Sequence, residues 1–355
     1  VYSALVDYIN RADRKSEQRR IRKVMNNHII RGGHLSAQPM GALRDFIARD
    51  PKTETPAVVN FPVLPEDPYK IDVPACRQLL EEHRPELIIF GKSMTLYHEP
   101  IADIRAMVVE LDLDCTILYD MAHVLGLIGP HFQRPFEEGA DLVTGSTHKT
   151  FFGTQRGIIG ARFKEHEPEY ELWHAIQRRA FPGSVSNHHL GTLLGMLMAT
   201  YELNQFKNEY QENIIRNAKT FAAALNTCGL DVAGDPDISF TQTHQIILNV
   251  GYAKGPEIAD RLEKNNIIVN YQAAPEEEGF TASGSLRMGV QEMTRFGMQP
   301  AHFEELAGLL HAVVIENRNV QKEVAVFRKQ FVDMQYCFSA LEFENEIQKL
   351  HQLLK

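Results

Sequence analysis

Three stretches of the sequence end an apolar run with side chains that can do chemistry. Ser93 follows the run at residues 86–91, Asp120 ends the run at 115–120 with His123 three residues later, and Ser146, His148 and Lys149 come at the end of the run at 140–146. Taken singly, each has an ordinary explanation. An aspartate after a strand often caps a helix, a single histidine is usually a hydrogen-bonded core residue, and a lysine at a strand exit is usually solvated.

The segments that would position these residues alternate between strand and helix from about residue 85 to 163. Apolar runs at 86–91, 115–120, 140–146 and 156–163 predict strands, and apolar residues at three- and four-residue spacing predict a helix at 101–113. Such alternation is typical of a largely parallel sheet covered on both faces. Because the carboxyl ends of parallel strands meet at one edge, we expect a hydroxyl, a carboxylate, an imidazole and an amine at that edge.

This combination fits a lysine amine that forms a Schiff base with an aldehyde. Pyridoxal phosphate is the common aldehyde cofactor, and its pyridine nitrogen is a good electron sink only when it is protonated. A carboxylate beside the nitrogen would keep it protonated, which is the role that Asp120 would fill. An aromatic or imidazole ring must also stack on the pyridine, and hydroxyls must bind its phenolic oxygen and phosphate.

Size and composition favour a two-domain globular protein. The chain has 355 residues, more than one hydrophobic core usually supports, so we expect a large domain at 1–200 and a C-terminal domain at 201–355. A net charge of −9 argues against nucleic acid as a partner. No run approaches the roughly 18 apolar residues of a membrane span. The four cysteines lie far apart, which fits the cytoplasm and predicts neither disulfides nor a zinc site.

The C-terminal third predicts a separate, smaller α/β domain. A long helical pattern at about 189–228 leads into it and would bridge the two domains. Strands are expected at 244–251, 267–272 and 283–290, a helix at 256–265, and two long helices from about residue 300 to the end.

Four separate segments, in order along the chain, resemble motifs of the serine hydroxymethyltransferases, a family of fold-type I pyridoxal-phosphate enzymes. These are "GGHL" at 32–35, similar to the stacking-histidine motif, "YDMAHVLGL" at 119–127, similar to the Asp-Met-Ala-His motif, "STHKT" at 146–150, similar to the Thr-His-Lys-Thr motif, and "SLRMG" at 285–289, similar to the segment with the carboxylate-binding arginine. The resemblance covers Val1 to about Gly297. It implies a mostly parallel sheet between helices and a smaller C-terminal α/β domain.

Carried over residue by residue, the resemblance implies catalytic roles for Lys149, Asp120, His34 and His123. Lys149 would hold pyridoxal phosphate covalently, Asp120 would pair with the pyridinium nitrogen, and His34 would stack on the ring. Ser93 and His123 would lie near the phenolic oxygen, and Ser146 and His148 would line the same pocket. Arg287 would bind the substrate α-carboxylate with its planar fork, although a structural ion pair is the alternative for this residue.

Several positions near the cofactor phosphate depart from the family pattern. The family has an arginine six residues after its lysine, whereas this chain has Gln155 there and Arg156 next. Ser186 and Asn187 stand where glycines are expected in the loop that approaches the phosphate of a neighbouring subunit.

The folate positions also depart from the pattern. Gln272 aligns with the family's asparagine near the folate. The family's phosphate-binding serine, active-site tyrosine and folate-contacting glutamate belong to segments that would precede Val1, so the chain is expected to begin part-way through a longer protein. Pyridoxal phosphate is therefore better supported as a cofactor than tetrahydrofolate.

The implied activity is cleavage or formation of the Cα–Cβ bond of β-hydroxy-α-amino acids through a glycyl quinonoid. With tetrahydrofolate as acceptor, the chain would be a serine/glycine hydroxymethyltransferase of one-carbon metabolism. Without folate it would be a threonine aldolase or transaldolase. The third alternative is a family member that has lost the reaction and serves as an assembly subunit. Because sites of this family lie between two subunits, a homodimer or a dimer of dimers is expected.

Overall fold

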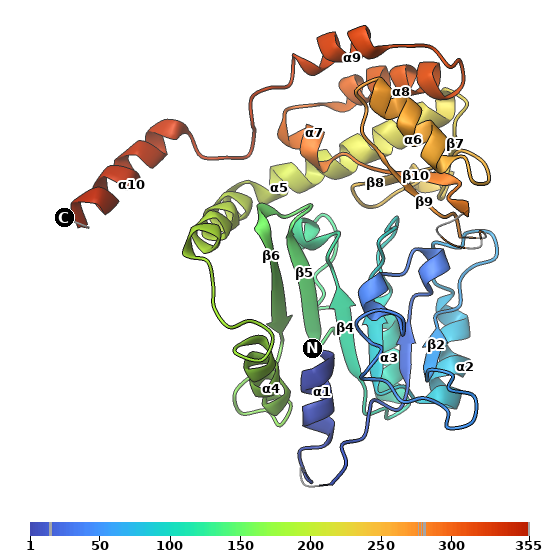
Figure 1. Cartoon of the computed structure of the whole chain (residues 1–355), viewed down its shortest axis with the longest axis vertical. Helices are drawn as coiled ribbons and strands as arrows, with labels where there is room; N and C mark the ends of the chain where they lie inside the picture. The colour runs from blue at the N-terminus through green and yellow to red at the C-terminus, as the bar shows by residue number, and fades with distance from the viewer. Residues whose placement is uncertain (14–15, 276, 278, 280–281, 354–355) are drawn as a thin grey trace.

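The computed structural model of the chain describes residues 1–13, 16–275, 277, 279 and 282–353. Figure 1 shows two β-sheets, one above the other along the long axis of the molecule, with helix α5 running from near the upper end of β6 to the smaller sheet. Helix α5 (Leu190–Thr227) is continuous over 38 residues. The predicted long helix is therefore confirmed, and the expected domain boundary near residue 200 falls inside it.

The larger sheet has six strands in the order β2 (Val58–Asn60), β1 (Val24–Asn26), β3 (Leu87–Phe90), β4 (Thr116–Asp120), β5 (Leu142–His148) and β6 (Phe152–Ala161). The strands β2, β1, β3, β4 and β5 pair in parallel, and β6 runs antiparallel to β5. The predicted parallel sheet is confirmed. Strands β1 and β2 are too short, at three residues each, to leave an apolar run in the sequence.

Helices cover both faces of this sheet because successive strand residues point to opposite sides. Ile88 and Phe90 of β3 pack in one core with helices α2 (Val73–His83) and α3 (Ile101–Glu110). Leu87 and Ile89 of the same strand pack in a second core with α1 (Tyr2–Ile9) and α4 (Tyr170–Ala180). Burial on both faces explains why β3 is apolar throughout.

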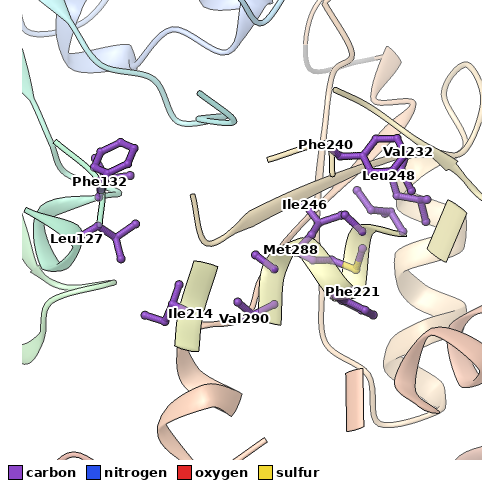
Figure 2. Packing of buried hydrophobic residues seen from close by; sticks show 14 of the residues in the cluster. Leu127, Phe132, Ile214, Phe221, Val232, Phe240, Ile246, Leu248, Met288 and Val290 are labelled. Atoms are coloured by element: carbon purple, nitrogen blue, oxygen red, sulfur yellow. The ribbon is translucent and has the colours of Figure 1, made fainter. Parts of the chain in front are cut away.

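The smaller sheet is antiparallel, in the order β7 (Asp231–Val232), β8 (Gln245–Asn249), β10 (Ser285–Gly289) and β9 (Asn270–Gln272). Helices α6 (Gly255–Lys264) and α8 (Pro300–Val314) pack with it. Figure 2 shows Phe221 of α5 near Ile246, Leu248 and Met288 of this sheet, so the second half of α5 contributes to this core.

The remaining helices complete the C-terminal region. They are α7 (Gln291–Arg295), α9 (Gln321–Arg328) and α10 (Ala340–Leu353), together with short 3-10 helices at Ile29–Arg31, Leu35–Ala37, Leu125–Leu127 and Pro236–Ile238. The expectation of two long helices after residue 300 was wrong, because the chain turns between α8, α9 and α10. Figure 1 shows α10 standing away from the rest of the chain. Within the described ranges, no helix is long and apolar enough to cross a membrane.

Candidate active site

The four residues predicted to be catalytic lie together at the carboxyl ends of the central strands. The Lys149 Nζ lies 3.4 Å from Nε2 of His123, and the rings of His123 and His34 meet edge to face with centroids 5.7 Å apart. Nδ1 of His34 lies 3.2 Å from Oδ2 of Asp120. Strands β4 and β5 bring Asp120, His123 and Lys149 to this edge, and the loop after β1 brings His34. We call these four residues the catalytic cluster.

Two hydrogen bonds and the His34 ring hold the Asp120 carboxylate. The Ser36 hydroxyl donates a 2.6 Å hydrogen bond to Oδ2, and the backbone N–H of Ala122 donates to Oδ1 at 3.1 Å. Burial acts to raise the pKa of Asp120, but His34 and these hydrogen bonds outweigh it and hold the pKa below its ordinary value. The group is therefore a buried carboxylate anion, suited to pair with a cationic nitrogen.

A glycine lets the loop after β3 pass close to Asp120. Gly91 has φ of +116°, in the region that side chains disfavour, and a Cβ at this position would lie 2.2 Å from the backbone oxygen of Asp120. The loop that carries Ser93 can therefore lie against the end of β4.

Lys149 and His123 are two bases whose pKa values are both shifted toward the neutral form. Burial lowers the pKa of Lys149, Asp120 acts to raise it, and the charge of Arg287 acts with burial. Burial, followed by the positive charges of Lys149 and Arg287, lowers the pKa of His123 to about 2. The hydroxyl of Thr150, the residue after Lys149, donates to the backbone oxygen of His123 at 2.9 Å and so links the two segments.

Arg287 reaches the same edge from β10 of the smaller sheet. Its NH1 group donates a 2.9 Å hydrogen bond to the backbone oxygen of Ser93, and burial lowers its pKa. With the residues that the structure describes, it forms no ion pair within 4.0 Å. The alternative of a structural ion pair thus gains no support, and the guanidinium has charge to offer an anion.

The three remaining predicted residues have different surroundings. The Ser93 hydroxyl donates to the backbone oxygen of Gly32 at 3.2 Å, next to the segment that carries His34. Ser146 is half-buried in β5, where the pairing with β6 shifts register between Ser146 and His148. His148 is exposed and lines a cavity of about 330 Å³ together with Lys149 and Arg295. Their predicted roles stay predictions.

The residues that depart from the family pattern lie mostly at the surface. Gln155 is exposed, whereas NH2 of Arg156 donates to the backbone oxygen of His189 at 2.6 Å, just before α5. Ser186 and Asn187 are exposed in the segment that leads to α5. Arg156, not Gln155, therefore ties this segment to the β5–β6 hairpin.

Sequence reasoning missed three polar residues of the site: Ser36, His244 and Gln245. Gln245 Nε2 lies 3.4 Å from Nδ1 of His123. His244 is buried, and its Nδ1 has no hydrogen-bond partner within the described part of the chain. Burial lowers its pKa to about 3, and the charges of Arg287 and Lys149 act in the same direction. The run "TQTHQ" at 241–245, five polar residues directly before the apolar residues of β8, was a usable signal.

A protein-family model described as serine hydroxymethyltransferase matches residues 18–310 of this chain. The chain belongs to this family. A serine hydroxymethyltransferase of Archaeoglobus fulgidus is 36% identical over 328 residues, which are 90% of this chain and 70% of that protein. One of Methanothermobacter marburgensis is 40% identical over 272 residues, covering 76% of this chain and 62% of the relative.

A solved structure adds a second comparison. The L-threonine transaldolase of Pseudomonas fluorescens superposes with a TM-score of 0.80 at 28% identity, covering 99% of this chain and 76% of that one. These matches confirm the fold-type I α/β architecture, pyridoxal phosphate as the cofactor, and the class of pyridoxal-phosphate-dependent transferase.

The side chains of the site fit that cofactor. They supply an amine with a lowered pKa, a buried carboxylate anion and, at the same edge, a guanidinium that has no ion-pair partner among the residues described. Among the described residues, no group of three His, Cys, Asp or Glu side chains is placed to hold a metal ion.

Proposed function

We propose that this serine hydroxymethyltransferase family member interconverts serine and glycine, with a one-carbon carrier of the tetrahydrofolate type as acceptor. The observation that carries the proposal is the contact of Lys149 with His123 beside the Asp120–His34 pair, with Arg287 facing them from the other sheet. The names of the relatives at 36% and 40% identity support hydroxymethyl transfer as the reaction.

Each residue of the site has a proposed task. Pyridoxal phosphate, when bound, supplies an aldehyde carbon for a covalent bond to an amine and a pyridine ring that accepts the electron pair of a breaking Cα–Cβ bond. Lys149 would provide the amine, and Asp120 would keep a proton on the pyridine nitrogen. His34 would stack on the ring, and His123, which is neutral, would hydrogen-bond an oxygen beside it.

Arg287 is proposed to orient the amino acid. Its planar fork suits two parallel hydrogen bonds to a carboxylate. Fixing the carboxylate fixes which bond at the α-carbon stands perpendicular to the acceptor ring, and that bond is the one that breaks. Because Arg287 is already anchored to Ser93 on one side, its position relative to Lys149 is set before substrate binds.

A folate-independent threonine aldolase or transaldolase is the second candidate. Two observations favour it: the structural similarity to an L-threonine transaldolase, and Gln272 at the position of the family's folate-side asparagine. The alternative of a subunit that has lost the reaction gains no support from the site, because the whole catalytic cluster is assembled.

The deciding experiment supplies the cofactor-loaded protein with threonine, and separately with serine, in the presence and absence of tetrahydrofolate. Serine cleavage that depends strictly on the folate supports hydroxymethyl transfer. Rapid release of acetaldehyde from threonine without folate would instead support the folate-independent threonine aldolase or transaldolase. Cleavage of neither amino acid would favour the subunit without a reaction.

We also propose that the chain acts as a homodimer or a dimer of dimers. Helix α5 carries four large apolar residues in its first half that are between 48% and 64% exposed, namely Leu190, Leu194, Leu197 and Tyr201. Their spacing places them along one face of the helix, and an exposed apolar face of this kind marks a protein–protein contact. A cytoplasmic location stays a prediction, supported by the four free cysteines.

A further inference from the structure

Gln245, at the start of β8, is a buried amide whose orientation is fixed by two backbone groups. Its Oε1 accepts a 2.7 Å hydrogen bond from the backbone N–H of Thr95, and its Nε2 donates at 3.1 Å to the backbone oxygen of Ser93. A backbone N–H can only donate and a carbonyl can only accept. The oxygen and the nitrogen of this amide are therefore assigned without ambiguity.

The same Nε2 group lies 3.4 Å from Nδ1 of His123. Because the amide nitrogen can only donate, Nδ1 must present its lone pair. The His123 ring is neutral, since burial is the largest of the causes that lower its pKa to about 2. A neutral imidazole carries one proton, so the proton of His123 lies on Nε2.

That proton faces Lys149, whose Nζ lies 3.4 Å from Nε2 of His123. A neutral amine has a lone pair that can accept from Nε2–H. An ammonium on Lys149 has only N–H donors, so it would face the Nε2–H donor of His123 and form no hydrogen bond with it.

We propose that Gln245 is a positioning residue that fixes the tautomer of His123 and, through it, favours the unprotonated amine of Lys149. The inference rests on the proposed function in one respect, that Lys149 is the reactive amine. A neutral amine can condense with an aldehyde, forming one C=N bond and releasing one water, whereas an ammonium has no lone pair to attack with.

The charged groups around Lys149 and His123 have opposite effects on the protonation of Lys149. Lys149 is faced by His123 and by the charges of Asp120, which favours the ammonium, and Arg287, which disfavours it. His244 and His34 also face His123. Asp120 must stay ionised to pair with the cofactor, and its charge raises the pKa of Lys149. The Nε2–H tautomer of His123 disfavours the ammonium and so acts against this effect of Asp120.

The test compares three variants of the full chain. Gln245→Glu keeps an acceptor for Thr95 but places an acceptor against Nδ1 of His123. Gln245→Met removes the donor without adding charge. Gln242→Glu is the matched control, because Gln242 lies three residues earlier and its Oε1 likewise accepts from a backbone N–H, that of His98 at 3.0 Å.

Two readouts do not depend on catalysis. Nitrogen-15 NMR of the histidines, after removal of the cofactor, reports which nitrogen of His123 carries the proton. Reductive methylation at neutral pH, read by peptide mass spectrometry, reports the fraction of neutral Lys149 amine. We expect the Nε2–H tautomer in the wild type and in Gln242→Glu, and Nδ1–H in Gln245→Glu with about fivefold slower methylation of Lys149. Gln245→Met should lose the single tautomer and methylate at an intermediate rate.

An Nδ1–H tautomer in the wild type overturns the proposal, and this measurement stands even if a variant does not fold. The proposal is also overturned if Lys149 is methylated at the wild-type rate in Gln245→Met and more slowly only in Gln245→Glu. The added negative charge alone would then explain the slower methylation. If Lys149 methylates as expected but never binds the cofactor covalently, the proposed function fails and the tautomer result remains.

Discussion

NH1 of Arg287 and Nε2 of Gln245 both donate to the backbone oxygen of Ser93, at 2.9 and 3.1 Å, so one carbonyl of the large sheet's loop accepts from two strands of the small sheet. The two sheets are thereby joined at the candidate site itself. This junction, together with the packing of α5 against both sheets, sets where Arg287 lies relative to Lys149.

Replacing Arg287 by lysine should remove the planar fork while keeping the charge. We expect kcat/KM for the amino acid to fall about a hundredfold, because an ammonium cannot make two parallel hydrogen bonds to a carboxylate. Steady-state kinetics with serine measure this. Arg261→Lys is the control, since Arg261 lies on α6 and bonds Asn317 at the surface. Equal kcat/KM values in the two variants would rule out Arg287 as the carboxylate-binding residue.

His244 should make folding stability depend on pH. Its pKa is about 3 in the folded chain, against an ordinary value of 6.5, so between these values the unfolded chain binds a proton that the folded chain does not. Stability is then fully present above about pH 6.5 and falls as the pH falls through this window. For one proton, the free energy of unfolding changes by about 1.4 kcal/mol per pH unit.

Urea unfolding at several pH values between 4 and 7 tests the role of His244. His244→Gln should flatten the dependence by about one proton, and His166→Gln, at an exposed position, should not. The two variants having the same slope would show that His244 is not held neutral by burial.

The exposed apolar face of α5 predicts the effect of a charge placed on it. Leu194→Glu should shift the protein toward the monomer in size-exclusion chromatography with light scattering, because an unpaired carboxylate would be buried at the contact. Leu353→Glu is the control, since Leu353 is 83% exposed at the end of α10. A Leu194→Glu protein with the wild-type mass would place the contact elsewhere or remove it.

The sequence predicts the parts of this site that depend on neighbouring strands, and it does not predict contacts between residues far apart along the chain. Asp120 ends the five-residue strand β4, His123 follows it, and Lys149 directly follows the seven-residue strand β5, so strand order alone brings them together. Gln245 could not be placed in this way, because its contact with His123 joins residues 122 positions apart in the other sheet. Ser36 reaches Asp120 across 84 positions through a short 3-10 helix that leaves no periodic pattern.

The boundaries of helices and domains also depend on contacts between residues far apart in the sequence. The apolar pattern of α5 is continuous, so its length was predictable, but a helix that packs on two sheets does not mark where one domain ends. Likewise, the break between α8 and α9 accompanies tertiary packing, because Val320, Val324 and Phe327 are buried in the first core, and helical periodicity does not record such contacts.

The most direct test is borohydride reduction of the purified protein saturated with pyridoxal phosphate, followed by peptide mapping. We predict a coloured protein in which reduction attaches the cofactor permanently to Lys149, and a Lys149→Ala variant that is not labelled. Lys164→Ala, which removes an exposed lysine shortly after β6, should be labelled like the wild type. A protein that stays colourless and unlabelled, or a label on another lysine, would contradict the account.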